Sequence, residues 1–137
     1  MRTKKKHRQK QLRHWRVRSK VCGTKDRPRM SVCFTNKNIH VQFIDDTAGS
    51  TLAAASSLSK KNAPERGKLA ANVTSAKIIG KLAAEVALAK GIKAVVFDRG
   101  GDRYHRSVGK GKDGKPVTVL GKLAVLAGAA REAGLKF

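Results

Sequence analysis

The chain has 137 residues, the length of one domain with a short extension; 40% are apolar and only 4% aromatic, so we expect a modest core of small side chains. The formal net charge of +22 opposes compaction and nearly requires a polyanionic partner. The sequence contains no apolar run near the ~18 residues of a membrane span, and no apolar stretch follows its basic start as in a secretory signal.

The first twenty residues hold ten Lys and Arg side chains, and no acid precedes Asp26. Leu12, Trp15 and Val17 are too few apolar residues to build a core there. Because like charges repel, residues 1–26 are expected to form a basic arm and connector that stays extended and disordered until it meets a polyanion, which we expect to be RNA. Trp15 could stack on that RNA or anchor the arm on its own domain. The arm's candidate RNA contacts are Arg2, Lys4, Lys5, Lys6, Arg8, Lys10, Arg13, Arg16, Arg18 and Lys20.

The two cysteines, Cys22 and Cys33, are predicted to be reduced thiols of a cytosolic protein, because their spacing gives neither a disulfide framework nor a CxxC pair. A zinc site could borrow His14 or His40, but no close pair of ligands supports it. No metal or other cofactor is therefore predicted.

The single folded domain is expected to occupy residues 27–137. Pro28 favours extended backbone at Arg27, so Arg27 and Arg29 should project from a rigid segment, either as phosphate clamps or as solvated side chains. Residues 30–35 and 39–43 alternate between apolar and polar side chains, which predicts two antiparallel strands joined by the turn at 36–38. Residues 50–57 should add a third strand, giving a meander.

The second half of the domain is predicted to contain two helices and one further strand. Asn72 is a candidate N-cap for a helix over 73–90 that Gly91 ends, and residues 58–71 and 99–115 read as loops. The apolar run within 93–98 predicts a buried strand, parallel to a neighbour. A last helix is predicted over 119–133, with Leu120 among its inward residues and Gly134 at its end. The predicted fold is α+β (α/β-like), βββαβα, an open mixed sheet covered by two helices.

Two motifs that suggest catalysis or nucleotide binding have a simpler explanation. The segment Gly109–Pro116 matches GxGxxG, but the extended chain favoured by Pro116 follows it instead of a helix N-terminus, so a basic hairpin turning at 113–114 is predicted. Asp45, Asp46 and Asp98 could bind two metals as in a nuclease. However, residues 45–46 lie in turn chemistry, and Asp98 precedes glycines without metal-ligand spacing. A structural role is therefore favoured for these acids, and no enzymatic activity is predicted.

Residues 99–106 form the second candidate RNA-binding segment. The two glycines after the predicted strand allow a close approach of the backbone to a ligand. Arginine forks suit phosphates, while tyrosine and histidine can stack on unpaired bases. Alternatively, Tyr104 packs on the domain and the loop is merely solvated. The candidate contacts here are Arg99, Arg103, Tyr104, His105 and Arg106.

Taken together, six stretches of this chain resemble the family of bacterial large-subunit ribosomal protein eighteen. They are residues 27–32 (RPRMSV), 35–46 (TNKNIHVQFIDD), 52–56 (LAAAS), 91–101 (GIKAVVFDRGG), the pair Tyr104-His105, and 129–137 (AAREAGLKF). The resemblance spans nearly the whole chain, which makes it more specific than any single motif.

This resemblance implies a non-catalytic protein of the ribosomal central protuberance, which binds 5S rRNA and helps to dock it on 23S rRNA beside neighbouring large-subunit proteins. Carried over by position, the implied RNA contacts are the arm Arg2–Lys20, Arg27, Arg29, Asn36, Lys37 and the loop Arg99–Arg106. The chain departs from the family by an inserted basic hairpin near 107–120. The implied location is a cytoplasmic ribosome, with an organellar ribosome left open. Two alternative functions stay open, a general nucleic-acid-coating protein and a metal-dependent nuclease.

Overall fold

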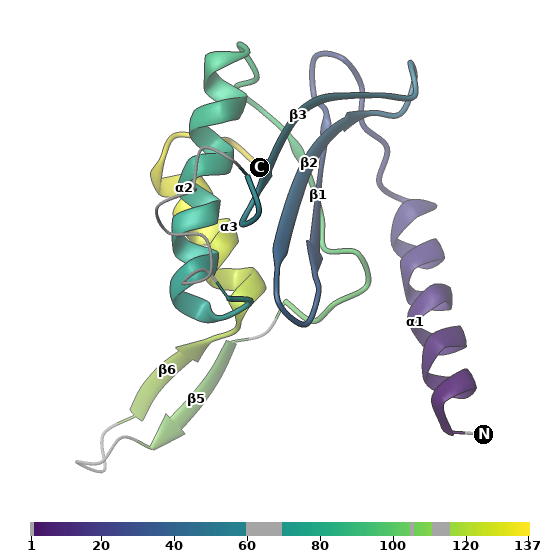
Figure 1. Cartoon of the computed structure of the whole chain (residues 1–137), viewed down its shortest axis with the longest axis vertical. Helices are drawn as coiled ribbons and strands as arrows, with labels where there is room; N and C mark the ends of the chain where they lie inside the picture. The colour runs from purple at the N-terminus through teal and green to yellow at the C-terminus, as the bar shows by residue number, and fades with distance from the viewer. Residues whose placement is uncertain (1, 60–69, 105, 111–115) are drawn as a thin grey trace.

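The computed structural model of the chain describes residues 2–59, 70–104, 106–110 and 116–137 (Figure 1). Its elements, in chain order, are α1 (Arg2–Arg18), β1 (Arg29–Phe34), β2 (Ile39–Asp45), β3 (Ser50–Ser56), α2 (Val73–Ala89), β4 (Val96–Asp98), β5 (Arg106–Lys110), β6 (Pro116–Leu120) and α3 (Lys122–Glu132). The predicted α+β class and the order βββαβα of the main sheet and its two helices are confirmed.

The main sheet has the strand order β3-β2-β1-β4. β1 and β2 are antiparallel, as are β2 and β3, while β4 is parallel to β1, as the helical crossover through α2 predicts. Figure 1 shows α2 and α3 together on one side of this sheet, with α1 on the other side and the β5–β6 hairpin projecting from one end.

The core lies between the sheet and the helix pair α2–α3. Alternate residues of the first two strands, Met30 and Val32 and then Ile39, Val41 and Phe43, are buried against small side chains of the helices, as the composition predicts. The helices approach closely: a Cβ atom added at Gly80 of α2 would lie 2.5 Å from the backbone oxygen of Leu126 in α3. Small residues therefore set the spacing of the two helices.

Local signals in the sequence locate α2 accurately. The Asn72 side chain accepts a hydrogen bond from the Ser75 amide (2.7 Å), which confirms the predicted N-cap, and such caps stabilise a helix by ~1 kcal/mol. Gly91 follows the helix with φ of 78°, a conformation that disfavours other residues.

The prediction that the N-terminal arm is extended and disordered is wrong, because residues 2–18 form helix α1. This stretch has no Gly or Pro and is rich in Arg, Lys and Gln, which all have high helix propensity. The charge repulsion that motivated the prediction is weakened since the side chains from residue 3 onward point into solvent; of those described, only His14 and Val17 are half-buried. The arm thus has local structure without a core of its own.

Two boundaries in the C-terminal part also differ from the predictions. The last helix begins at Lys122 and not at 119, because Val119 and Leu120 pair with the start of β5, and the predicted inward Leu120 is 42% exposed. The predicted loop 99–115 contains strand β5. The hairpin itself, predicted from Pro116, is present as the β5–β6 pair, although its predicted turn at 113–114 lies outside the described residues.

Candidate nucleic-acid interface

Arg29 is the centre of a buried ionic bridge at one end of the sheet. Its guanidinium donates to both oxygens of Asp46 (2.7 and 2.8 Å) and, through Nη1, to Asp98 (2.9 Å). Only 4% of the Arg29 side chain and none of that of Asp98 is exposed. The hydrogen bonds from Arg29 lower the pKa of Asp46 to about 2, and the same bonds raise the pKa of Arg29. The prediction that Arg29 projects toward a phosphate is therefore wrong.

The two carboxylates of this bridge also bind backbone amides of the flanking loops. Asp46 accepts from Gly23 N (2.8 Å), and Asp98 accepts from Gly100 N (2.8 Å). An added Cβ at Gly23 would lie 2.3 Å from the backbone nitrogen of Arg29, so only glycine fits there. The bridge thus fixes the connector that joins α1 to the domain and the loop that follows β4; α1 and this loop together carry most of the predicted RNA contacts.

The three acids considered for a nuclease site all have structural partners. Asp45 accepts hydrogen bonds from the amides of Thr47 (2.9 Å) and Ala48 (3.3 Å), as predicted for a turn, while Asp46 and Asp98 share Arg29. Within the described ranges, no group of three or more His, Cys, Asp or Glu side chains is arranged to hold a metal ion. A two-metal site therefore has no support among these residues.

Helix α1 is docked against the loop after β4. Arg13 Nε donates to the carbonyl of Gly101 (3.3 Å), and Arg18 lies 3.5 Å from Asp46. Gly101 has φ of 82°, and an added Cβ there would lie 3.1 Å from the amide nitrogen of His14. Gly101, one of the two glycines that predicted a close approach of a ligand, therefore allows a close approach of α1. As a result the basic arm and the basic loop form one continuous surface.

Most of the predicted contacts are exposed on this surface or next to it. Trp15 is 59% exposed on α1, so it does not anchor the arm by burial in the domain. Arg27 is exposed as well, although its Nε donates to the carbonyl of Val95 (3.3 Å). The exposed predicted residues are Lys4, Lys5, Lys6, Arg8, Lys10, Arg13, Arg16, Arg18, Lys20, Arg27, Asn36, Lys37, Arg99, Arg103 and Tyr104.

Three predicted contacts are described only partly or not at all. The side chain of Arg2 is not described, Arg106 is described only as the first residue of β5, and His105 lies outside the described residues.

Tyr104 combines the two alternatives considered for it, packing on the domain and exposure to a ligand. Its ring packs edge-to-face on Phe97 at 6.1 Å and its hydroxyl accepts from Arg131 (3.2 Å), yet it is 44% exposed.

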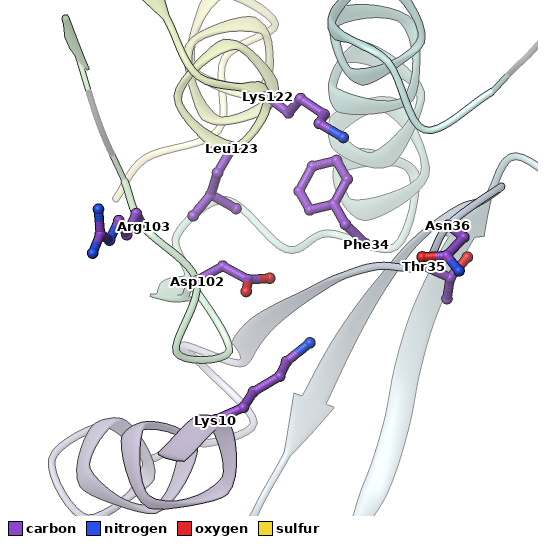
Figure 2. A pocket seen from close by; sticks show the side chains of 8 residues that line it. All are labelled: Lys10, Phe34, Thr35, Asn36, Asp102, Arg103, Lys122 and Leu123. Carbon is purple, nitrogen blue, oxygen red and sulfur yellow. The ribbon is translucent and has the colours of Figure 1, made fainter. Parts of the chain in front are cut away.

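An open cleft of about 340 Å³ lies where α1, the β1–β2 turn, the loop after β4 and the start of α3 meet (Figure 2). It brings together the predicted residues Lys10, Asn36 and Arg103, which come from three different parts of the sequence. Sequence reasoning missed its other functional candidates, which are Phe34, Asp102 and Lys122. The alternation in 30–35 predicts only a strand face for Phe34, and no periodic signal marks a residue that becomes a cleft wall through tertiary contacts.

The described part of the chain has no helix long and apolar enough to span a bilayer.

Comparison with known proteins gives a consistent match over almost the full length. Residues 4–137 match the family described as ribosomal L18 of archaea, bacteria, mitochondria and chloroplast. The chain is 50% identical over 128 residues to the large ribosomal subunit protein uL18 of Clostridium beijerinckii, covering 93% of this chain and 92% of that protein. It is 47% identical over 133 residues to uL18 of Lactococcus lactis subsp. lactis, with 96% and 95% covered, and 46% identical over 125 residues to uL18 of Alkaliphilus oremlandii, with 91% and 89% covered.

Proposed function

Because the chain belongs to the ribosomal L18 family, the protein is a constituent of the large ribosomal subunit, and we propose that it binds 5S rRNA and helps to attach that RNA to 23S rRNA. Its place would be the central protuberance, beside neighbouring ribosomal proteins, and its role there would involve no chemical step. The matched relatives are bacterial, which agrees with the expected cytoplasmic ribosome.

The observation that best supports this proposal is the joint basic surface of α1 and the loop after β4. In the proposal, residues 1–26 are the RNA-binding arm and connector, and residues 27–137 are the domain that orients them. The arm contributes ten of the chain's positive charges and leaves +12 on the rest, so both parts attract a polyanion. The proposed contacts are the exposed residues given above together with Arg2, His105 and Arg106. Arg29, which is buried, would act only by holding the connector and the loop in place.

The β5–β6 hairpin projects from the domain near the start of α3 (Figure 1), and its two strands pair with each other and with no strand of the main sheet. A projecting basic hairpin is suited to reach an RNA segment or a neighbouring protein beyond the main surface. We include it in the proposal as an additional contact within the ribosome.

The proposal is tested by measuring the affinity of the purified protein for 5S rRNA as a function of salt. With roughly six to ten ionic contacts, affinity should fall by about 10³–10⁵ between 50 and 200 mM salt. Competition with duplex DNA separates a 5S rRNA-binding protein from a general nucleic-acid-coating protein. Weak competition by DNA is the expected result, whereas equal competition by DNA and 5S rRNA would favour the coating protein.

A further inference from the structure

The cleft in Figure 2 contains a carboxylate that phosphate binding does not explain. Asp102 lies half-buried in the cleft among Lys10, Arg103 and Lys122, and its carboxylate points into the open space. Within the described part of the chain, this carboxylate has no hydrogen bond and no ion pair. A negative charge at this position weakens the attraction for a phosphate, so it indicates a ligand group that donates hydrogen bonds.

Phe34 provides an apolar wall for the same cleft. It is the last residue of β1, half-buried against the core, and its ring projects into the space that Asp102 faces (Figure 2). Lys122 lies near the ring, with Nζ 5.9 Å from the ring centroid, and is held there by its hydrogen bond to the carbonyl of Ala71 (2.8 Å). Unpaired bases stack on partly exposed aromatic rings of this kind, and the cations Lys10, Arg103 and Lys122 line the same cleft.

We propose that this cleft binds a single unpaired guanine nucleotide of the RNA partner. The guanine ring packs against Phe34, Asp102 accepts hydrogen bonds from N1–H and the N2 amino group, and the adjacent phosphates contact Lys10 and Arg103. The inference rests on the proposed RNA-binding function, and it specifies which base the cleft within the RNA-binding surface selects.

The choice of guanine follows from the donors on each base. A carboxylate has two acceptor oxygens and no donor when ionised. Guanine alone presents two N–H donors side by side on its Watson–Crick edge, while the other bases present an acceptor next to their N–H group, which a carboxylate repels. In a duplex this edge is already paired, so the base must be unpaired. The cleft volume of about 340 Å³ is near the lower end of the range for small-molecule sites, ~300–1,000 Å³, which suits one nucleotide.

The test uses the full chain and a set of RNA hairpins that differ only in one bulged nucleoside, which is guanosine, adenosine, uridine or inosine. A fully paired hairpin is the control. Affinities are measured by fluorescence anisotropy at one physiological salt concentration. A bidentate base contact discriminates against the wrong base, so the wild-type protein should bind the bulged guanine about tenfold more tightly than the bulged adenine, which corresponds to ~1.4 kcal/mol. Inosine lacks the N2 amino group and should bind with intermediate affinity.

Two variants and one matched control sharpen the result. Asp102→Asn should reduce the preference for guanine to about twofold or less, although the loss of a negative charge should by itself strengthen RNA binding. Asp26→Asn removes the same charge from an exposed position outside the cleft and should leave the preference unchanged. Phe34→Leu keeps an apolar side chain against the core but removes the ring, and should weaken binding of every bulged hairpin relative to the paired one.

The outcomes separate this inference from the proposed function. Equal affinity of the wild-type protein for all four bulged hairpins, or a guanine preference that persists in Asp102→Asn, would overturn the inference. The proposed function would survive that result if 5S rRNA still bound tightly. Failure to bind 5S rRNA would instead overturn the proposed function.

Discussion

Helix α1 and the buried bridge at Arg29 both depend on basic side chains, but they place them in opposite environments. The described side chains of α1 are almost all exposed; the helix packs on Gly101, and its two polar contacts with the domain are long, at 3.3 and 3.5 Å. Arg29 is 4% exposed and makes three shorter bonds to two carboxylates. An exposed charge costs the fold little and remains available to a partner, whereas a buried charge must be fully paired within the fold.

The strongest test of this contrast is to remove the buried charge. Arg29→Met leaves Asp46 and Asp98 without their shared partner, and breaking a buried ion pair from one side typically costs ~3–5 kcal/mol of folding free energy. Urea unfolding measures this loss. The matched control is Arg27→Met, at an exposed arginine two residues away, which should change stability by less than ~1 kcal/mol.

Arg29→Lys tests whether the geometry of the bridge matters in addition to its charge. Lysine keeps the positive charge but lacks the planar fork that contacts both carboxylates, so its stability should fall between that of the wild type and that of Arg29→Met. If both substitutions at position 29 leave the unfolding free energy unchanged, the bridge does not hold the loops as described.

Removing the exposed charges should weaken RNA binding strongly while changing the stability of the fold little. Deletion of residues 1–20 takes away ten positive charges but leaves Gly23 and its bond to Asp46. We expect affinity for 5S rRNA to fall by about a hundredfold or more at moderate salt, because several phosphate contacts are lost. The folding free energy should change by less than ~1 kcal/mol, because the contacts that disappear are two long polar ones and the packing of α1 on Gly101, all outside the core. Loss of the cooperative unfolding transition in the truncated chain would contradict this division between arm and domain.

The pH dependence of stability should show the smallest effect. Asp46 has a pKa of about 2 in the folded protein and an ordinary value of 3.8, so its ionised form is stabilised by folding. This contribution, on the order of 2 kcal/mol, is present above pH ~4 and is lost as the pH falls toward 2. Thermal unfolding between pH 5 and pH 2 should therefore show a steeper loss of stability in the wild type than in Asp46→Asn. Parallel pH profiles would show that the ion pair adds no such stability.

The fold was predictable where the signals are local. The alternation in 30–35 and 39–43, the cap at Asn72 and the stop at Gly91 each act over a few residues, and the structure confirms them. Helix α1 differs from the predicted extended arm because exposed like charges repel only weakly in water, so the helix propensity of the segment prevails. The start of α3 differs from the prediction because Val119 and Leu120 continue the apolar pattern of the helix but belong to β6.

The candidate site was predictable in its charge but not in its geometry. The exposed basic residues of the arm and the 99–104 loop follow directly from composition. The role of Arg29 does not, because its partners Asp46 and Asp98 are 17 and 69 positions away in the sequence. The cleft at Asp102 is likewise formed by four separate segments. Such groupings arise from the register between β1 and β4, which no pattern within one element reveals.

The order in which the chain is synthesised gives the position of α1 a further consequence. The core is completed by α3 and by Leu135, which is 2% exposed, and Lys136 bridges to Ala94 beside β4. During translation the basic helix emerges before these closing residues. The most strongly charged segment is therefore free to meet cellular RNA while the rest of the nascent polypeptide is still unfolded. We therefore expect newly made molecules to bind nucleic acid before they finish folding.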